Sequence, residues 1–210
     1  MQTFLPHADF EQSAGALDHK RLGKQRVEVI QILRALTRPG YGWAHHPAVL
    51  MWRGYEEALG RYGLSCAEAW LELGFDDTCA ATIAADLRTI GVDLVRTQDE
   101  LARVGALPGW LGDEELHRSY RAALLRKDPG WYGPRFPGTS EDLPFRWPVR
   151  SEGAVQAERR KAEAARLREQ RAVARAAEEA DRARRQRSRA AKRGWKTRRA
   201  NSSTRRGRQR

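Results

Sequence analysis

The residues best suited to chemistry lie in one segment, LDHKRLGKQRVEVIQILRAL, at positions 17–36. It combines four closely spaced cations near its start with the carboxylate of Glu28. Cationic side chains neutralise phosphates, and a carboxylate among cations can act as a general acid or base or stabilise a developing positive charge. The cations are, in chain order, Lys20, Arg21, Lys24 and Arg26. This segment is therefore the first candidate for a polyanion-binding or catalytic site.

A helix is the element that must position these side chains. Asp18 stands where an N-cap is expected, and Pro39-Gly40 form a stop signal. At helical spacing the apolar residues fall on one stripe, which predicts that this side of the helix faces a core. The stripe consists of Leu22, Val29, Leu33 and Leu36.

Arg26 and Glu28 each leave two alternatives open. Arg26 projects within the apolar stripe, and a guanidinium is not buried without partners. Either this side of the helix borders a groove, or Arg26 pairs with a buried carboxylate. Glu28 is either the i+4 partner of Lys24 on a solvated face or a carboxylate of the site.

Two further places in the sequence carry candidate side chains. Trp131 and Tyr132 follow Pro129 and could stack on bases displaced from a duplex, or they could fill the core. His46 precedes Pro47 in an aromatic loop, where a structural role or a substrate contact is favoured over a metal site. Neither an HExxH nor a CxxC motif accompanies it, so the sequence predicts no metal and no cofactor.

Several functional classes are excluded by missing motifs. The glycines form neither GxxxxGK nor GxGxxG, and no GxSxG is present. No run of about 18 apolar residues predicts a membrane span, and the N-terminus has no secretory pattern. Cys66 and Cys79 fit no metal spacing and are expected to be buried thiols. We therefore expect a cytoplasmic protein, associated with the nucleoid if its partner is DNA.

The charge divides the chain into two parts. Residues 1–150 contain 18 Lys and Arg against 20 Asp and Glu, a net charge of −2, whereas residues 151–210 contain 21 against 7, a net charge of +14. The second part is rich in Ala, Arg, Glu, Lys and Gln and is predicted to be helical over 152–192, then disordered. A basic tail of this kind indicates contact with a nucleic-acid backbone.

Helical periodicity and capping signals account for most of residues 1–150. Asp113 is a further expected N-cap, and Ser65 with Glu68 forms a capping-box pattern. The segment after residue 126 contains Pro, Gly and aromatics and is expected to wrap over the helices rather than form one. The prediction is a compact all-α bundle, 1–150, with a basic tail, 151–210. The expected helices cover 9–16, 18–36, 48–62, 65–74, 77–90, 98–104 and 114–126.

Three stretches, LDHKRLGKQRVEVIQIL, GYGWAHHPAVLMWRGYEEAL and KDPGWYG, together resemble the pyrimidine-dimer DNA glycosylase family, the phage endonuclease V type, and most closely its uncharacterised bacterial relatives. The similarity extends from the N-terminus to about Pro137. The features shared with the phage enzyme are few: Leu22 with Glu28 six residues later, Arg26 in the same turn, Gly74-Phe75 at a helix end, and the Pro129-x-Trp131-Tyr132 loop.

The resemblance implies a compact helical fold and a specific chemistry. In this family the N-terminal α-amine attacks C1′ of a damaged nucleotide, the glycosidic bond breaks, a Schiff base forms and β-elimination nicks the strand. By the same resemblance Glu28 would be the essential glutamate, Arg26 a groove arginine, and the other cations with Trp131 and Tyr132 would contact DNA. An α-amine suits this role because it titrates near neutral pH. The implied protein is a monomeric glycosylase and AP lyase acting on damaged duplex DNA, without metal.

The sequence departs from the phage pattern at its start. Gln2 is a large residue, and removal of an initiator Met generally requires a small second residue, so the free amine belongs to Met1. About four residues are also inserted before Asp18. The alternative to an enzyme is a non-catalytic nucleic-acid-binding protein of the same fold, which the net charge of −2 in residues 1–150 favours.

Overall fold

The computed structural model describes residues 1–149, 153, 156, 160–179 and 182. The chain divides into two units, Met1–Glu152, here called the body, and Gly153–Arg210, here called the tail. Every described secondary-structure element of the body is a helix, which confirms the all-α prediction. The body helices are α1 (Phe10–Ala16), α2 (His19–Thr37), α3 (Pro47–Leu50), α4 (Glu56–Glu72), α5 (Cys79–Arg88), α6 (Gln98–Arg103), α7 (Glu114–Lys127) and α8 (Pro129–Tyr132).

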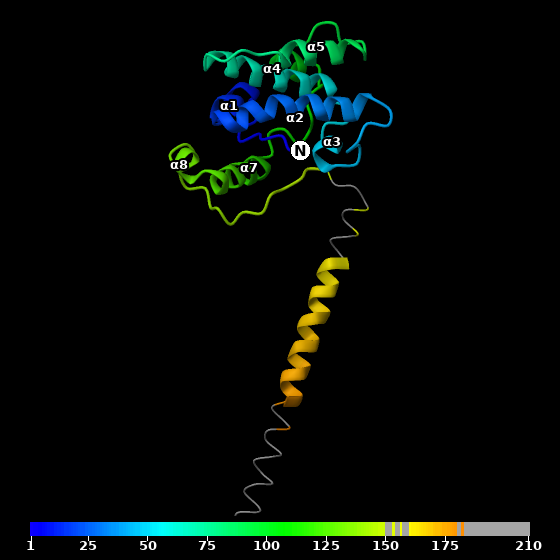
Figure 1. Ribbon diagram of the computed structural model, residues 1–210, viewed down its shortest axis with the longest axis vertical. Coiled ribbons are helices and arrows are strands. Elements are labelled where there is room, and N and C mark those ends of the chain that lie inside the picture. Colours follow the sequence, from blue (N-terminus) through cyan, green and yellow to red (C-terminus); the bar gives the residue numbers. More distant parts are fainter. Residues whose placement is uncertain (150–152, 154–155, 157–159, 180–181, 183–210) are drawn as a thin grey trace, which may run out of the picture. The chain divides into compact units, whose positions relative to one another are not determined.

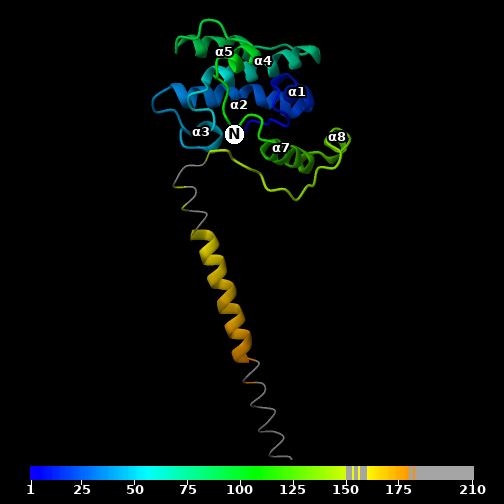
Figure 2. The ribbon, with the colours of Figure 1, turned by 180° about the vertical axis from the view of Figure 1, so that it is seen from behind.

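α2 lies in the middle of the body, with α4 and α5 on one side and α7 on the other (Figures 1 and 2). It packs against α4 and α5, and α1 packs against α4. Gly63 of α4 allows this close approach, because a Cβ there would lie 2.6 Å from Val29 Cγ1 of α2 and 2.7 Å from Ile83 Cδ1 of α5. The central helix is therefore fixed tightly from the α4–α5 side.

The predicted start of α2 is confirmed by its cap. The Asp18 carboxylate accepts hydrogen bonds from the backbone N–H groups of Lys20 and Arg21, at 2.9 and 3.2 Å. The same carboxylate accepts a 2.6 Å hydrogen bond from the Tyr132 hydroxyl, which ties α8 to the start of α2. Burial raises the pKa of Tyr132, so this hydroxyl remains a donor.

Two predicted helices around residues 48–74 were wrong in their boundaries. The chain turns at Gly54, whose φ of +83° is left-handed, so the first helix stops at Leu50. α4 then runs through Ser65 without a break, because Ser65 is buried and accepts a hydrogen bond from Arg61, while Glu68 pairs with Arg61 instead of capping. The capping-box pattern of Ser65 and Glu68 therefore marks no helix start.

The segment after α7 contains one short helix, α8, where no helix was predicted. Pro129 is compatible with this helix because it lies in the first turn, where its missing N–H would have no partner within the helix. Beyond it, Phe136, Phe145 and Trp147 pack against the core, as expected of a wrapping segment. Cys66 and Cys79 are buried free thiols, and burial raises the pKa of Cys66 to about 12.

The tail is helical over residues 160–179, and every residue described there is exposed. Of the helix predicted for 152–192, the remaining parts fall mostly outside the described residues, as does the predicted disorder beyond it.

Candidate active site

The N-terminal segment is held in an extended conformation by α2. The backbone N–H of Phe4 donates to Gln25 Oε1 at 2.8 Å, and Gln25 Nε2 donates to the carbonyl of Gln2 at 3.0 Å. Gln25 therefore pairs with the segment as a neighbouring strand would. Its amide is buried in the apolar stripe, and these two hydrogen bonds satisfy it.

Side chains from α4 and α7 hold the same segment from its other sides. The carbonyls of Phe4, Leu5 and Pro6 are contacted by polar groups at 2.5, 2.7 and 2.7 Å, so the backbone is fixed over several residues. The groups are, in order, the Tyr62 hydroxyl, His117 Nδ1 and Arg121 Nη1. The N-terminus is consequently a fixed part of the structure.

The side chains of the first residues are also buried. Thr3 is inaccessible and its hydroxyl accepts a hydrogen bond from Trp52 Nε1 at 3.1 Å. The Met1 side chain is only 6% exposed and packs against the core. A retained Met1 therefore helps to position the α-amine.

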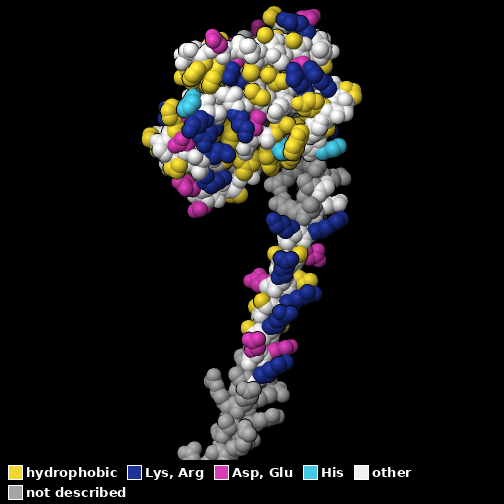
Figure 3. Space-filling view, in the orientation of Figure 1, with side chains coloured by type: hydrophobic (Ala, Val, Ile, Leu, Met, Phe, Trp, Pro, Cys, Tyr) yellow, Lys and Arg dark blue, Asp and Glu magenta, His cyan; other side chains and the backbone are white. Residues whose placement is uncertain are grey.

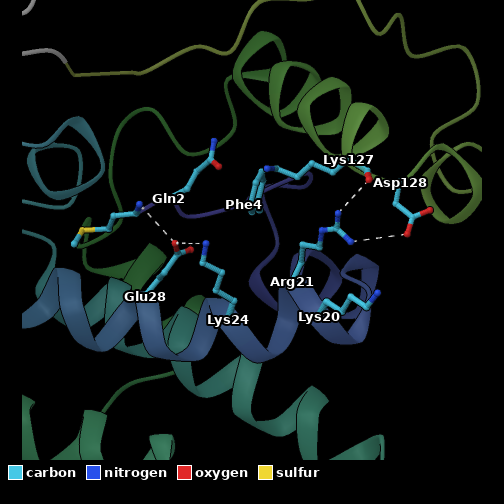
Figure 4. Close-up of a pocket in the computed structure, with 9 residues that line it drawn as sticks. Gln2, Phe4, Lys20, Arg21, Lys24, Glu28, Lys127 and Asp128 are labelled. Atoms are coloured by element: carbon cyan, nitrogen blue, oxygen red, sulfur yellow. Dashed lines mark hydrogen bonds and ion pairs between the residues drawn. The ribbon is translucent and has the colours of Figure 1, made fainter.

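The α-amine of Met1 lies beside Glu28. Its nitrogen is 3.6 Å from Glu28 Oε1, and Lys24 Nζ lies 3.6 Å from the same oxygen; both contacts are drawn in Figure 4. Glu28 is 6% exposed although it lies opposite the core stripe, because the N-terminal segment covers it. The two alternatives for Glu28 are thus both present, a Lys24 partner and a carboxylate beside the terminal amine.

Glu28 and the amine line a pocket of about 410 Å³ between α2, the N-terminal segment and the end of α7. Its cations exceed its carboxylates, which favours an anionic ligand. The lining residues are Met1, Gln2, Phe4, Lys20, Arg21, Lys24, Glu28, Lys127 and Asp128. Lys and Arg side chains gather on this side of the body in Figure 3.

Arg21 joins the two walls of the pocket. Its guanidinium lies 3.2 Å from Asp18 and 3.8 Å from Asp128, and it donates to the carbonyl of Lys127 at 3.1 Å. Arg21 is thus shared between structure and pocket, whereas the Lys24 side chain is 75% exposed and free to meet a ligand.

His46 lies close enough to the amine to respond to its charge. Its Nδ1 accepts the backbone N–H of Ala48 at 3.1 Å and caps α3. Burial, and then the positive charge of the Met1 amine, lower the pKa of His46. His46 thus caps α3, and its place in the site stays a prediction.

Arg26 does not line the pocket, which corrects the groove prediction. It pairs with Asp77 on the opposite side of α2, and its guanidinium carbon lies 4.0 Å from the centre of the Trp70 ring. The second alternative for Arg26, a buried carboxylate partner, is the one found. The sequence indicated that a buried Arg26 needs a carboxylate partner, but only the fold shows that this partner is Asp77.

Trp131 and Tyr132 are also away from the pocket. Tyr132 is fully buried against Phe136. Trp131 is 36% exposed, but Arg135 stacks on its ring at 3.8 Å, and it lines a separate apolar hollow of about 580 Å³ beside Phe75. The structure therefore brings together Met1, Lys20, Arg21, Lys24 and Glu28, with His46 nearby, and leaves the other predicted residues elsewhere.

Phe4, which lines the pocket, and four further residues of the site were missed from the sequence. Lys127 and Asp128 lie at the end of α7, more than a hundred residues from Arg21 in the sequence. The only local signal there was Pro129, which indicates the end of a helix. Gln25 and Gln2 form the contact that positions the amine. A buried glutamine at the edge of an apolar stripe was the signal that could have revealed Gln25.

The fold and site define a helical protein whose terminal amine lies beside a buried glutamate in a cationic pocket. Residues 1–83 match the model of the family described as pyrimidine dimer DNA glycosylase, which confirms the family resemblance. The matched region includes Met1, Glu28 and the α2 cations but not Lys127 or Asp128. The family supports a DNA glycosylase role on pyrimidine dimers, with DNA as substrate. No curated protein and no solved structure matches the chain.

The described part of the chain has neither a metal-binding cluster nor a membrane-spanning helix. It contains no group of three or more His, Cys, Asp and Glu side chains placed to hold a metal ion. None of its helices has the length and apolar character required to cross a membrane.

Proposed function

We propose that this protein is a DNA glycosylase with AP-lyase activity whose nucleophile is the Met1 α-amine. The observation that carries the proposal is the 3.6 Å contact of this amine with the buried Glu28 carboxylate, inside a cationic pocket. Amines in this position can attack a sugar carbon while the surrounding cations hold the flanking phosphates.

The chemistry follows from these groups. The unprotonated amine attacks C1′, the C1′–N glycosidic bond breaks, and the base leaves with a proton. The nitrogen lone pair then forms the C1′=N bond as the C1′–O4′ bond breaks, O4′ takes up a proton from Glu28, and the nitrogen keeps its last proton, which gives a cationic Schiff base between Met1 and C1′. Removal of a C2′ proton then breaks the C3′–O bond and releases the phosphate, and water hydrolyses the Schiff base. Glu28 accepts and returns the protons and stabilises the cationic imine.

The test is borohydride trapping on DNA that contains an abasic site or a pyrimidine dimer. Reduction of the Schiff base leaves a covalent adduct, which peptide mapping should locate at Met1. Acetylation of the α-amine should abolish it. An adduct of undiminished yield on the acetylated protein would overturn the assignment of the nucleophile.

Lys24 provides the matched control, because its amine touches the same oxygen of Glu28. Lys24→Arg keeps the positive charge but removes an amine that can form an imine. The variant should be trapped as well as the wild type. Loss of the adduct in this variant alone would identify Lys24, and not Met1, as the nucleophile.

We also propose that the tail contacts the DNA backbone. In the helix over 160–179, Arg168, Arg171 and Arg175 fall on one face at helical spacing, with Lys161 one heptad before Arg168. Such a stripe matches a line of phosphates and gives sequence-independent affinity. Removal of residues 151–210 should weaken binding to undamaged duplex and flatten its dependence on salt, and an unchanged salt dependence would contradict this role.

A further inference from the structure

The loop between α2 and α3 exposes a tryptophan beside the site. Trp43 is 66% exposed, the largest exposed fraction of any aromatic side chain described in the body. Its φ of +72° is left-handed, a conformation that costs energy in a residue with a bulky side chain. Neither its burial nor its backbone preference accounts for a tryptophan here.

The Trp43 ring is held in place by contacts of its loop and of His46. The backbone N–H of His46 donates to the Trp43 carbonyl at 2.8 Å, and Arg53 donates to the carbonyl of Ala44 at 3.3 Å. The Trp43 ring meets the edge of His46 at 5.7 Å between ring centres, and His46 in turn meets Trp147 at 5.6 Å. Because Trp147 packs on the core, Trp43 is held in place while much of its surface stays open.

His46 and α3 lie next to the N-terminus. In both views of the ribbon the N-terminus lies beside α3, the helix that His46 caps (Figures 1 and 2). The charge of the amine also acts on His46. Lys20 and Lys24 precede Glu28 and thus lie toward the start of α2, and the loop that carries Trp43 follows its end.

We propose that Trp43 is a stacking platform for a nucleobase that has left the duplex stack next to the sugar bound at Met1. The cationic side of the pocket holds the phosphates of the strand, and a base displaced from its partner needs a flat apolar surface to replace its lost stacking. Trp131 offers no comparable surface, because Arg135 covers one face of its ring. This inference rests on the proposed function, since it requires a damaged strand at the amine.

The experiment compares two duplexes that differ only in whether a base can leave the stack easily. One contains a tetrahydrofuran abasic analogue, which loosens the neighbouring and opposite bases, and the other is undamaged. Dissociation constants are measured by fluorescence anisotropy for the full-length wild type, Trp43→Ala and Trp43→Phe. We expect Trp43→Ala to weaken binding to the tetrahydrofuran duplex by roughly tenfold and to leave binding to undamaged duplex unchanged, with Trp43→Phe retaining most of the affinity.

Leu94 supplies the matched control, because it is 84% exposed in a loop between α5 and α6, and Leu94→Ala should bind both duplexes as the wild type does. Equal affinity of Trp43→Ala and wild type for the tetrahydrofuran duplex would overturn the proposal, and a surface for a protein partner would then remain as the use of Trp43. An equal loss on both duplexes would also overturn it, since a general effect on the loop would explain that result.

Borohydride trapping separates this inference from the proposed function. At saturating protein, Trp43→Ala should still form the Met1 adduct, because the amine and Glu28 are untouched. If the wild type gives no adduct while Trp43→Ala shows the selective loss of affinity, the platform stands and the Schiff-base chemistry falls. If the adduct forms and the affinities are equal, the chemistry stands and the platform falls.

Discussion

The two sides of α2 use charge in different ways. On the side of α5, arginines meet buried carboxylates at hydrogen-bonding distance: Arg34 and Arg38 lie 2.7 and 2.5 Å from Asp86, and Arg26 pairs with Asp77. On the pocket side, Glu28 is approached by two amines at 3.6 Å each, beyond the 2.7–2.9 Å typical of a charge-assisted hydrogen bond.

This difference separates structure from chemistry along one helix. The arginine pairs are direct contacts between α2 and the segment that contains Asp77 and Asp86, so they hold α2 against α5. Glu28 is equally buried, but its amines stand back from it and face a pocket, so a reacting atom has space to approach. Substitutions on the α5 side should therefore change stability, whereas those on the pocket side should change activity.

The largest effect is expected for Glu28→Gln on the pocket side. The amide keeps the size of the side chain but can neither take up a proton nor stabilise a cationic imine as well. Single-turnover cleavage of abasic DNA should fall by about 10²–10⁴-fold, with unchanged DNA affinity and unfolding midpoint. Unchanged cleavage kinetics would show that Glu28 is only a partner of Lys24, and a chain that binds DNA but never cleaves it would be the non-catalytic alternative.

On the α5 side, Arg26→Met should chiefly destabilise the fold. It leaves the Asp77 carboxylate, whose side chain is 2% exposed, buried without its partner. Loss of one member of a buried pair lowers the free energy of unfolding by about 3–5 kcal/mol, measurable by urea denaturation.

The double variant Arg26→Met with Asp77→Asn is the control for that measurement. It removes both charges, and the asparagine can keep the hydrogen bond that Asp77 accepts from the backbone of Ala80. Part of the lost stability should return. If Arg26→Met instead lowers DNA affinity without changing stability, Arg26 is a DNA-binding residue.

A smaller loss is expected for Gly63→Ala, where α4 approaches α2 and α5. The added methyl would lie within 2.7 Å of Val29 and Ile83 side-chain atoms, so the helices must shift apart, at about 1–3 kcal/mol. Gly15→Ala in α1 is the matched control, because nothing lies within 4 Å of the added Cβ. This control should be neutral or slightly stabilising in the same urea titration. A destabilised Gly15→Ala would show that loss of glycine, not crowding, is the cause.

The smallest effect concerns His46 and pH. Because folding lowers the pKa of His46, its contribution to stability is complete above its ordinary value of 6.5 and is lost as the pH falls below it. His46→Asn keeps an N-cap acceptor without titrating. Its free energy of unfolding should therefore fall less than that of the wild type between pH 7.5 and about 5.5. His7, whose pKa burial also lowers, should leave a residual slope in both proteins. Identical slopes would exclude His46 as a contributor.

Local signals in the sequence predicted the helices and part of the site. Asp18 and Asp113 marked helix starts because capping depends on neighbouring residues. Lys24 and Glu28 lie one turn apart, so helical spacing alone places them together. The Met1–Glu28 contact was expected only through the family resemblance.

Long-range partners could not be predicted in the same way. Nothing local to Arg26 distinguishes Asp77 as its partner, and nothing local to Lys127 places it opposite Arg21, since both depend on how helices far apart in the chain pack. Tyr132 was left between a surface and a core role because its sequence neighbours are polar and apolar alike. Its hydrogen bond to Asp18 decided this, and that bond exists only once α8 has docked on α2.

The anchoring of residues 2–6 has a practical consequence for producing this protein. An affinity tag fused ahead of Met1, or even a few residues left after its proteolytic removal, would convert the α-amine into a peptide nitrogen and crowd the pocket beside Glu28. The hydrogen bonds of Gln25, His117 and Arg121 would hold the fused chain in that position and keep it from swinging aside. On the proposed mechanism, such a preparation would fold normally and lack activity, so purification handles belong at the other end of the chain.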